Sequence, residues 1–287
     1  MNNQQINTSQ SWPAVIKECA LLLSIVFLIR TFGFGLYQVP TESAETTMLV
    51  GERFFANKFT YLFSDPQRND YISMNDPTFV YSSCYPVRLY QEYVGWPIWP
   101  FGPTNFTKRI IGIPGDHVKG VIEDGKPVVY LNDKKLDEPY LNKYPIMAVV
   151  LGDKITWRSY DPAVSDTAQQ FYRVTNPWHP DSNMNITSEY TRTKEGRLLM
   201  EPNKPTKSDE FDIVLGENQY WGMGDNRRGS ADSRVFGPID RRLIHGKIVF
   251  RIWSIDSNES WWIIDLITHP IDFWSRLRWN RFFQWIQ

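Results

Sequence analysis

A serine and a lysine in separate segments of the chain could together perform nucleophilic chemistry. Ser43 closes the segment Pro-Thr-Glu-Ser just beyond a hydrophobic stretch near the N-terminus, and Lys108 opens the run Lys-Arg-Ile-Ile-Gly-Ile-Pro-Gly-Asp at residues 108–116. The chain has 4 histidines, and they form no pattern matched with serine and aspartate. A serine nucleophile would therefore need another base, and a neutral lysine can take its proton.

A lysine serves as a base only where its pKa is lowered. The reference pKa of about 10.4 must fall by several units, which burial among apolar groups can achieve. Lys108 precedes a β-branched run, which predicts a strand over residues 109–113 ending in a turn at 114–116. An alternating strand would either enclose the amine among isoleucines or direct it to water, and the sequence leaves both open. Lys58 is the rival base, but it lacks the arginine and the Pro-Gly-Asp that follow Lys108.

Composition limits the class of protein. With 287 residues, 42% hydrophobic and 22% charged, the chain can bury a sizeable core as one large domain or two intimate ones. Its formal net charge of -1 gives no global attraction for nucleic acid, and no basic block argues otherwise. Cys19 and Cys84 lie far apart, so neither a disulfide framework nor a zinc site is indicated.

The N-terminal stretch predicts a membrane anchor. Residues 19–29 carry no charge, and a helix over residues 12–37 would be about 39 Å long, enough to cross a bilayer. Lys17, Glu18 and Arg30 lie near its ends, where long side chains can reach the interface. A cleavable signal peptide is the alternative, but a positively charged start and a small-x-small cleavage site are both missing. The first sixteen residues contain no Lys or Arg, so loop charge does not decide the orientation.

The remainder is predicted to be mainly β. A hairpin is expected around Glu-Asp-Gly-Lys-Pro at residues 123–127, because its turn needs the positive φ that glycine permits. Residues 96–103, rich in Pro and Trp, predict a loop, and the polar residues 161–208 predict an inserted or variable subdomain. The strands expected from β-branched and aromatic runs cover residues 54–63, 79–81, 109–113, 118–122, 128–131, 211–214 and 247–253.

The C-terminal tail, residues 256–287, combines aromatic side chains with arginines. Such a mixture suits a membrane interface, where rings lie at headgroup depth and arginines meet lipid phosphates. A terminal segment packed on the domain explains the composition equally well, and the sequence leaves both readings open.

Taken in order along the chain, several segments resemble the type I signal peptidases, membrane-bound serine proteases of the Ser-Lys dyad class. The resemblance extends from about Phe27 to Phe250 and leaves residues 161–208 essentially unmatched. The hairpin and the tail around residues 278–281 add weaker support. The matching segments are Phe-Leu-Ile-Arg-Thr-Phe at 27–32, Pro-Thr-Glu-Ser at 40–43, the run at 108–116, and Gly-Asp-Asn-Arg-Arg-Gly-Ser-Ala-Asp-Ser-Arg at 224–234.

The resemblance implies a role for each matched residue. Ser43 would be the nucleophile and Lys108 the general base, with the hydroxyl of Ser230 holding the amine. The Ser43 N-H and the hydroxyl of Thr41, which replaces the usual serine, would form the oxyanion hole. Residues expected to brace the site through salt bridges or to shape its loop are Arg109, Asp225, Asn226, Gly229, Asp232 and Arg234.

Residues 44–48 depart from the family, which usually has Met after the nucleophile and Pro-Thr-Leu two residues later. Here the stretch reads Ala-Glu-Thr-Thr-Met, which motivates a membrane-anchored paralogue that binds signal peptides without cutting them as one alternative function. A maturation peptidase dedicated to one exported substrate is another.

The leading expectation is removal of signal peptides from exported preproteins at the outer, periplasmic face of the cytoplasmic membrane, by a single-pass protein. Its partners would be signal peptides and the lipid bilayer, no metal or organic cofactor is suggested, and the oligomeric state is not specified. The implied fold is a mainly β, signal-peptidase-like ribbon or barrel with an inserted β subdomain. The expected divisions are an N-terminal tail at 1–12, an anchor at 13–37, a catalytic domain at 38–255 with a variable region at about 140–210, and the tail at 256–287.

Overall fold

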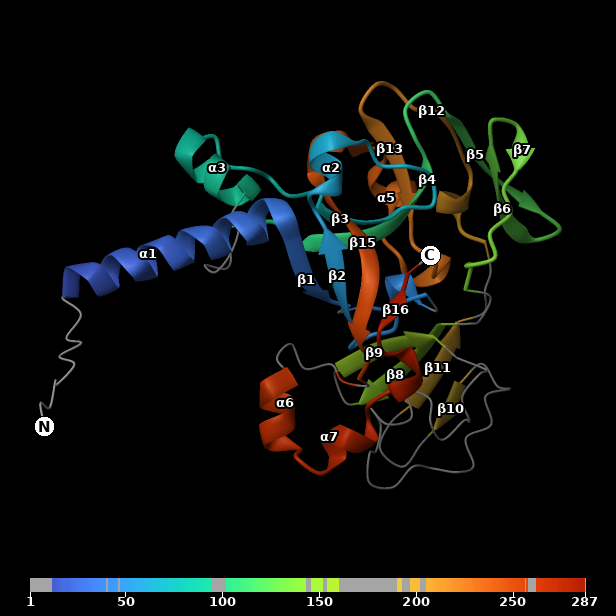
Figure 1. Ribbon diagram of the computed structural model, residues 1–287. Helices are drawn as coiled ribbons and strands as arrows, with labels where there is room; N and C mark the ends of the chain where they lie inside the picture. Colours follow the sequence, from blue (N-terminus) through green and yellow to red (C-terminus); the bar gives the residue numbers. More distant parts are fainter. Residues whose placement is uncertain are drawn as a thin grey trace, which may run out of the picture.

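In the computed structural model, the regular structure of the described residues is mainly β-strand, behind one long helix (Figure 1). The described residues are 12–39, 41–45, 47–93, 102–142, 146–151, 154–159, 190–192, 197–201, 205–255, 257 and 262–286. Their strands form an 8-stranded sheet and two 4-stranded sheets. The mainly β prediction is confirmed. Each sheet is an open path of strands, so the described strands form a ribbon-like arrangement rather than a closed barrel.

The largest sheet carries both segments that hold the predicted dyad. Its order is β1-β2-β15-β3-β4-β13-β14, with β16 added beside β15, and the pairings among these strands are antiparallel. The predicted strands at residues 109–113 and 247–253 are confirmed and extend further towards the N-terminus. The strands are β1 (Phe34–Gln38), β2 (Arg53–Asn57), β3 (Tyr71–Asn75), β4 (Asn105–Gly112), β13 (Gln219–Met223), β14 (Ile239–Asp240), β15 (Ile244–Trp253) and β16 (Gln284–Trp285).

A second sheet contains the predicted hairpin. β5 (His117–Glu123) pairs with β6 (Lys126–Leu131), and the connecting residues Asp124 and Gly125 have φ of 51° and 73°. Both values lie in the left-handed region, as a tight hairpin turn requires. β7 (Lys134–Lys135) and β12 (Phe211–Val214) complete the order β12-β5-β6-β7.

The third sheet lies within the region predicted to be inserted. Its order is β10-β11-β8-β9, all in antiparallel pairs. The strands are β8 (Ile146–Leu151), β9 (Lys154–Ser159), β10 (Tyr190–Arg192) and β11 (Arg197–Glu201).

One helix is long and apolar enough to cross a membrane. α1 (Trp12–Leu28) continues into a π-helical turn, η1 (Ile29–Gly33), and projects away from the sheets (Figure 1). The candidate span, Trp12–Gly33, has 22 residues and a mean hydropathy of 2.0, and none of it is buried against the protein. Its length matches the hydrocarbon core of a bilayer.

The predicted helix over residues 12–37 is wrong at its end. The Gly33 carbonyl accepts the backbone N-H of Lys58 at 2.9 Å and that of Phe59 at 3.2 Å. From Phe34 the chain instead pairs with β2, so strand pairing replaces the last helical turn.

Two further strand predictions need correction. The strand expected over residues 54–63 ends at Asn57, because the Asn57 side chain accepts the Thr60 N-H at 3.1 Å and the chain turns into α2 (Thr60–Phe63). Residues 79–81 form no strand, because Asp76 accepts the Thr78 N-H at 2.8 Å and holds a turn there. Most of the loop predicted at 96–103 lies outside the described residues.

Short helices connect the strands, and the tail packs back on the largest sheet. β16 pairs with β15, and Ile255 bridges to Leu277. The exposed rings of Trp279 and Trp285 still face outward. The remaining helices are η2 (Glu42–Ala44), α3 (Tyr85–Tyr93), η4 (Lys207–Asp209), η5 (Arg227–Gly229), α5 (Ser233–Phe236), η6 (Arg241–Leu243), α6 (Trp262–Thr268), α7 (Asp272–Ser275) and η7 (Trp279–Arg281).

Buried apolar clusters lie beside both predicted catalytic segments. Ala44 and Met48 are completely buried with Phe54, whereas Ile72 and Ile110 belong to a cluster beneath β4. Full burial of one large apolar side chain contributes about 1.5 to 3 kcal/mol. The segments that carry Ser43 and Lys108 are thus anchored in the core by their own neighbours.

Candidate active site

Lys108 lies in the middle of β4 and is only 4% exposed. It pairs with Ile72 on β3. Because side chains alternate along a strand, Lys108 shares one face of β4 with Phe106 and Ile110, both in the same apolar cluster. The Lys108 ammonium nitrogen lies 5.5 Å from the centre of the Phe106 ring. The sequence left the orientation of this lysine open, and the structure places it inside.

A glycine on β13, Gly222, leaves room for the side chain of Lys108. Gly222 pairs with Ile110 across the two strands. A Cβ at Gly222 would stand 3.2 Å from the Lys108 Cβ and 2.6 Å from Ile239. Glycine at this position therefore leaves room for the Lys108 Cβ beside β13.

Ser43 lies in the short helix η2, which packs against β4 and against η5. Ser43 is 7% exposed, and its carbonyl accepts the backbone N-H of Asn226 at 3.2 Å. A Cβ at Gly224 would lie 2.7 Å from the Ser43 carbonyl oxygen and 2.3 Å from the Ser230 hydroxyl oxygen. Ser43 and Ser230 therefore both lie against Gly224, which directly follows β13, the strand next to Lys108.

Ser230 presents a buried hydroxyl to this space. Its Oγ is buried without a hydrogen-bond partner among the described residues. A buried hydroxyl in that state is rare, because an unmade hydrogen bond costs about 1 to 3 kcal/mol. Thr41, predicted as an oxyanion donor, is exposed immediately before η2.

Arg109 and Asp225 form a buried ion pair behind the site. Arg109 Nε donates to Asp225 Oδ1 at 2.9 Å and Nη2 donates to Oδ2 at 2.8 Å, and the two side chains are 2% and 0% exposed. The guanidinium lies 4.1 Å from the Tyr140 ring centre. Burial opposes the charge of Arg109, but the Asp225 carboxylate outweighs it and raises the pKa of this arginine. The expected bracing role of Arg109 thus has its partner in Asp225.

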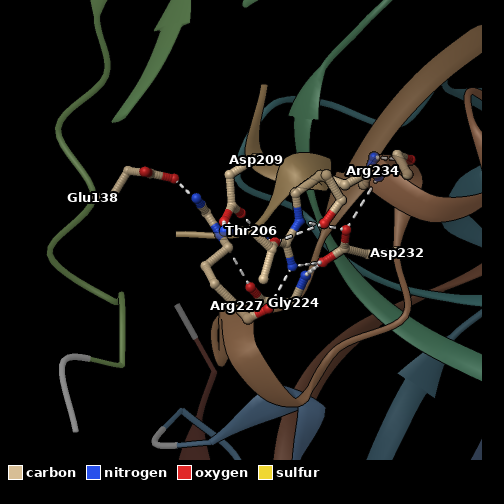
Figure 2. A network of polar contacts seen from close by, with 10 residues as sticks. Glu138, Thr206, Asp209, Gly224, Arg227, Asp232 and Arg234 are labelled. Atoms are coloured by element: carbon tan, nitrogen blue, oxygen red, sulfur yellow. Dashed lines mark hydrogen bonds and ion pairs between the residues drawn. The ribbon is translucent and has the colours of Figure 1, made fainter. Parts of the chain in front are cut away.

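A second polar network fixes the loop that carries Ser230 (Figure 2). Asp232 accepts the Gly224 N-H at 3.0 Å and Arg234 Nε at 2.9 Å, and Arg234 also binds Asp209 at 2.6 Å. Burial raises the pKa of Asp232, but the hydrogen bond and charge of Arg234 overcome this and lower it. Arg227 pairs with Glu138 at the edge of the same network. These contacts tie the backbone at Gly224 to two arginines.

The predicted loop residues have structural partners that the sequence did not reveal. Asn226 is 1% exposed, and its carbonyl accepts the Gly229 N-H at 3.1 Å, closing the turn of η5. Glu138 and Asp209 are acidic members of the network that lie outside the recognised segments and were not predicted. Only their acidic character could have indicated them, because nothing in the local sequence specifies a distant partner.

Lys58, the rival base, lies at the end of the anchor helix. Its Nζ donates to the Arg30 carbonyl at 3.0 Å and lies 5.9 Å from the Tyr37 ring centre. Burial, followed by the positive charge of Arg30, lowers the pKa of Lys58 to about 8. Its contacts therefore belong to the junction between the anchor and β2. For metals, no cluster of three or more His, Cys, Asp or Glu was found among the residues that the structure describes.

Several known proteins are similar to this chain. A signal peptidase I of Rickettsia prowazekii is 26% identical over 99% of this chain and 97% of its own length, and one of Buchnera aphidicola subsp. Acyrthosiphon pisum is 25% identical over 91% and 82%. A crystal structure of a signal peptidase I from Enterococcus faecalis V583 covers 64% of this chain and 97% of that chain at 20% identity, with a TM-score of 0.29.

The family comparison extends over most of the chain. The sequence model of the family "Signal peptidase, peptidase S26" matches residues 12–253, which include the anchor helix and the segments of Ser43, Lys108 and Ser230. The chain belongs to the signal peptidase family, peptidase S26.

Proposed function

We propose that the protein removes signal peptides from exported preproteins, with Ser43 as the nucleophile and Lys108 as the general base. The observation that carries this assignment is the convergence of Ser43, Lys108 and Ser230 on the glycine-punctuated end of β13. Two of the three contact Gly224, and the third contacts Gly222. Family membership supports serine endopeptidase chemistry in the chain as a whole.

The burial of Lys108 supports its role as a base. A buried ammonium group loses hydration, which favours the neutral amine that catalysis needs. The Asp232 carboxylate acts in the opposite direction: burial raises its pKa, but Arg234 and also the charge of Lys108 lower it. The Ser230 hydroxyl has no hydrogen-bond partner among the described residues, so it can accept a hydrogen bond from that amine or donate one to it. Such a bond would orient the amine towards Ser43.

The proposed reaction proceeds through an acyl-enzyme. Ser43 Oγ attacks the scissile carbonyl while Lys108 takes its proton, and Lys108 then returns the proton to the leaving amine. A water molecule next attacks the ester, with Lys108 again taking and returning one proton, which releases the signal peptide and frees Ser43. The tetrahedral oxyanion would be held by the Ser43 N-H and the Thr41 hydroxyl.

The substrate proposal follows the family. We expect an extended peptide that adds to an open strand edge, with small residues at the first and third positions before the cut. The open edges of the sheets provide backbone groups suited to that mode of binding.

Membrane attachment through α1 would place the site close to the bilayer that holds the substrate. The exposed side chains of Leu36 and Trp285, 75% and 73% exposed, add apolar surface near the anchor end of the largest sheet. We propose the outer, periplasmic side of the cytoplasmic membrane for the sheets, because exported substrates emerge there.

Cleavage of a purified preprotein with an Ala-x-Ala site tests the assignment. Full-length protein in detergent should cleave it, and Ser43→Ala and Lys108→Ala should each abolish cleavage. Lys58→Ala is the matched control and should retain activity, since its amine binds the Arg30 carbonyl.

Other outcomes would replace the proposal. Cleavage by Ser43→Ala at the wild-type rate would remove Ser43 from the mechanism. Peptide binding without cleavage by the wild type would favour a non-catalytic paralogue, which the changed residues 44–48 motivate. Cleavage of a single member of a preprotein panel would indicate a dedicated maturation peptidase.

A further inference from the structure

A buried carboxylate lies at the centre of contacts between the C-terminal tail and the turn after Ser43. Glu52 is completely buried and accepts the Leu49 N-H at 3.0 Å. Arg251 Nε donates to Glu52 Oε2 at 2.7 Å, and Arg281 Nε donates to Oε1 at 2.5 Å. Arg281 belongs to η7 in the tail, so Glu52 joins distant parts of the chain.

The same two arginines also bind the backbone of that turn. Arg251 Nη2 donates to the Thr47 carbonyl at 2.5 Å, and Arg281 Nη2 donates to it at 3.1 Å. Arg278 Nη1 donates to the carbonyl of Val50 at 3.1 Å. We call the contacts of Arg251 and Arg281 with Glu52 and Thr47 the arginine clamp.

Thr47 connects the arginine clamp to the segment that carries Lys108. Its hydroxyl donates to Asp225 Oδ2 at 2.5 Å, and Asp225 is the partner of Arg109, the neighbour of Lys108. The two arginines thus hold Thr47 by its carbonyl, while Asp225, just after β13, holds it by its side chain.

Ser43 is tightly coupled to this turn. The Met48 N-H donates to the Ala44 carbonyl at 2.9 Å, and both side chains are completely buried. Because a close-packed core cannot deform smoothly, a displacement of Thr47 would be passed to η2 and to the Ser43 hydroxyl.

We propose that Arg281 is a positioning residue for the peptidase reaction, through which the C-terminal tail sets the location of Ser43 relative to Lys108. This inference rests on the proposed roles of those two residues. The tail would then help to position the nucleophile, independently of what its exposed aromatic side chains contact.

Arg281 suits mutation better than its partners. Its side chain is 23% exposed, whereas that of Arg251 is 7% exposed and that of Glu52 is fully buried. Removal of Arg281 leaves Glu52 paired with Arg251, so no buried charge is left alone.

Arg276 provides a matched control within the same tail. It is 13% exposed and binds Asp265 at 2.6 Å, and its ion pairs lie within the tail. Asp265 is 1% exposed and would keep the longer contact with His269 at 3.3 Å. Arg276→Met should therefore perturb the tail at least as much as Arg281→Met, without changing the arginine clamp.

The experiment compares full-length wild type, Arg281→Met, Arg281→Lys and Arg276→Met in detergent, at a temperature below every thermal transition. With an Ala-x-Ala preprotein, Arg281→Met should lower kcat about tenfold or more and leave KM within about twofold, because misplacement of a nucleophile slows the chemical step. Arg281→Lys should be intermediate, since one ammonium group replaces a planar fork of donors. Arg276→Met should retain the wild-type kcat.

Hydrogen exchange of the Leu49 amide gives a readout independent of cleavage. This N-H donates to Glu52, so its protection should fall in Arg281→Met and remain in Arg276→Met.

Three results would overturn the inference: an unchanged kcat in Arg281→Met, equal losses in Arg281→Met and Arg276→Met, or an increase confined to KM. If Ser43→Ala is inactive and Arg281→Met is normal, only the role of Arg281 is refuted and the proposed function stands. Full cleavage by Ser43→Ala would instead refute the proposed function, and the role of Arg281 in the reaction with it.

Discussion

Neutralising Asp225 should expose the cost of leaving a charge alone behind the active site. Asp225→Asn keeps the shape of the side chain but removes the negative charge that faces Arg109. Both side chains are almost completely buried, and the two hydrogen bonds between them measure 2.9 and 2.8 Å. The guanidinium would remain in a site that water does not reach.

The magnitude follows from the burial of the pair. Removing one partner of a buried ion pair costs about 3 to 5 kcal/mol. For a domain of about 150 to 250 residues, each kcal/mol lowers the melting temperature by about 2 to 4 °C, so we expect a decrease of roughly 6 to 20 °C. Thr47 also loses a charged acceptor for its hydroxyl. We therefore expect the decrease in melting temperature to lie in the upper half of this range.

The assay is a double-mutant cycle on full-length protein in detergent, with unfolding by urea followed through tryptophan fluorescence. The double variant Arg109→Met with Asp225→Asn should be less destabilised than the sum of the single variants by about 2 kcal/mol or more, because it leaves no unpaired charge. The exposed pair of Arg242 and Asp240 is the control, and Arg242→Ala should change stability by less than about 1 kcal/mol. Additive single effects, or a loss below about 1 kcal/mol for Asp225→Asn, would refute the reasoning.

Three further measurements address the site. Ser230→Ala should lower kcat about 10- to 100-fold with little change in stability, because Lys108 becomes an ammonium as it takes the Ser43 proton and a hydrogen bond to a charged group is worth about 1.5 to 3 kcal/mol; an unchanged pH-rate profile and kcat would exclude contact with Lys108. Gly224→Ala should lower kcat about 100-fold, because its Cβ would stand 2.3 Å from the Ser230 hydroxyl and 2.7 Å from the Ser43 carbonyl oxygen; normal kinetics would contradict that close approach. The pKa of Asp232 is lowered in the folded protein, as Arg234 outweighs burial. Its contribution to stability should therefore be complete above about pH 4 and lost at lower pH, and the pH dependence of the urea midpoint should weaken in Asp232→Asn.

Local sequence patterns predicted several parts of the fold whose causes are local. The hairpin around Gly125 follows from turn chemistry, and β4 follows from a β-branched run that ends at Pro-Gly-Asp. The anchor follows from its hydropathy. Ser43, Lys108 and Ser230 were chosen as candidate site residues because short segments around them resemble one family, and in the structure those segments lie beside Gly222 and Gly224.

Some predictions failed because local side-chain turns at Asn57 and Asp76 were overlooked. Others failed where distant residues decide the outcome. The anchor helix ends at Gly33 because the Gly33 carbonyl accepts hydrogen bonds from the backbone N-H groups of Lys58 and Phe59. The Arg109 and Asp225 partners are 116 residues apart, and the Arg281 and Glu52 partners are 229 apart. Charge composition alone permits many pairings, so the sequence predicted Arg109 and Asp225 as residues that support the site without predicting that they pair.

The turn after Ser43 differs from the family pattern, and the structure indicates what replaces the missing proline. Proline would restrain the turn covalently by fixing its own φ, a restraint that is independent of pH and of other segments. Here Thr47 is restrained by hydrogen bonds from Arg251 and Arg281 and to Asp225. Such a restraint requires ionised carboxylates and an intact tail. The position of Ser43 in this chain therefore depends on contacts made by the C-terminal tail. In a turn that contains proline, the position of the serine would depend on the turn itself.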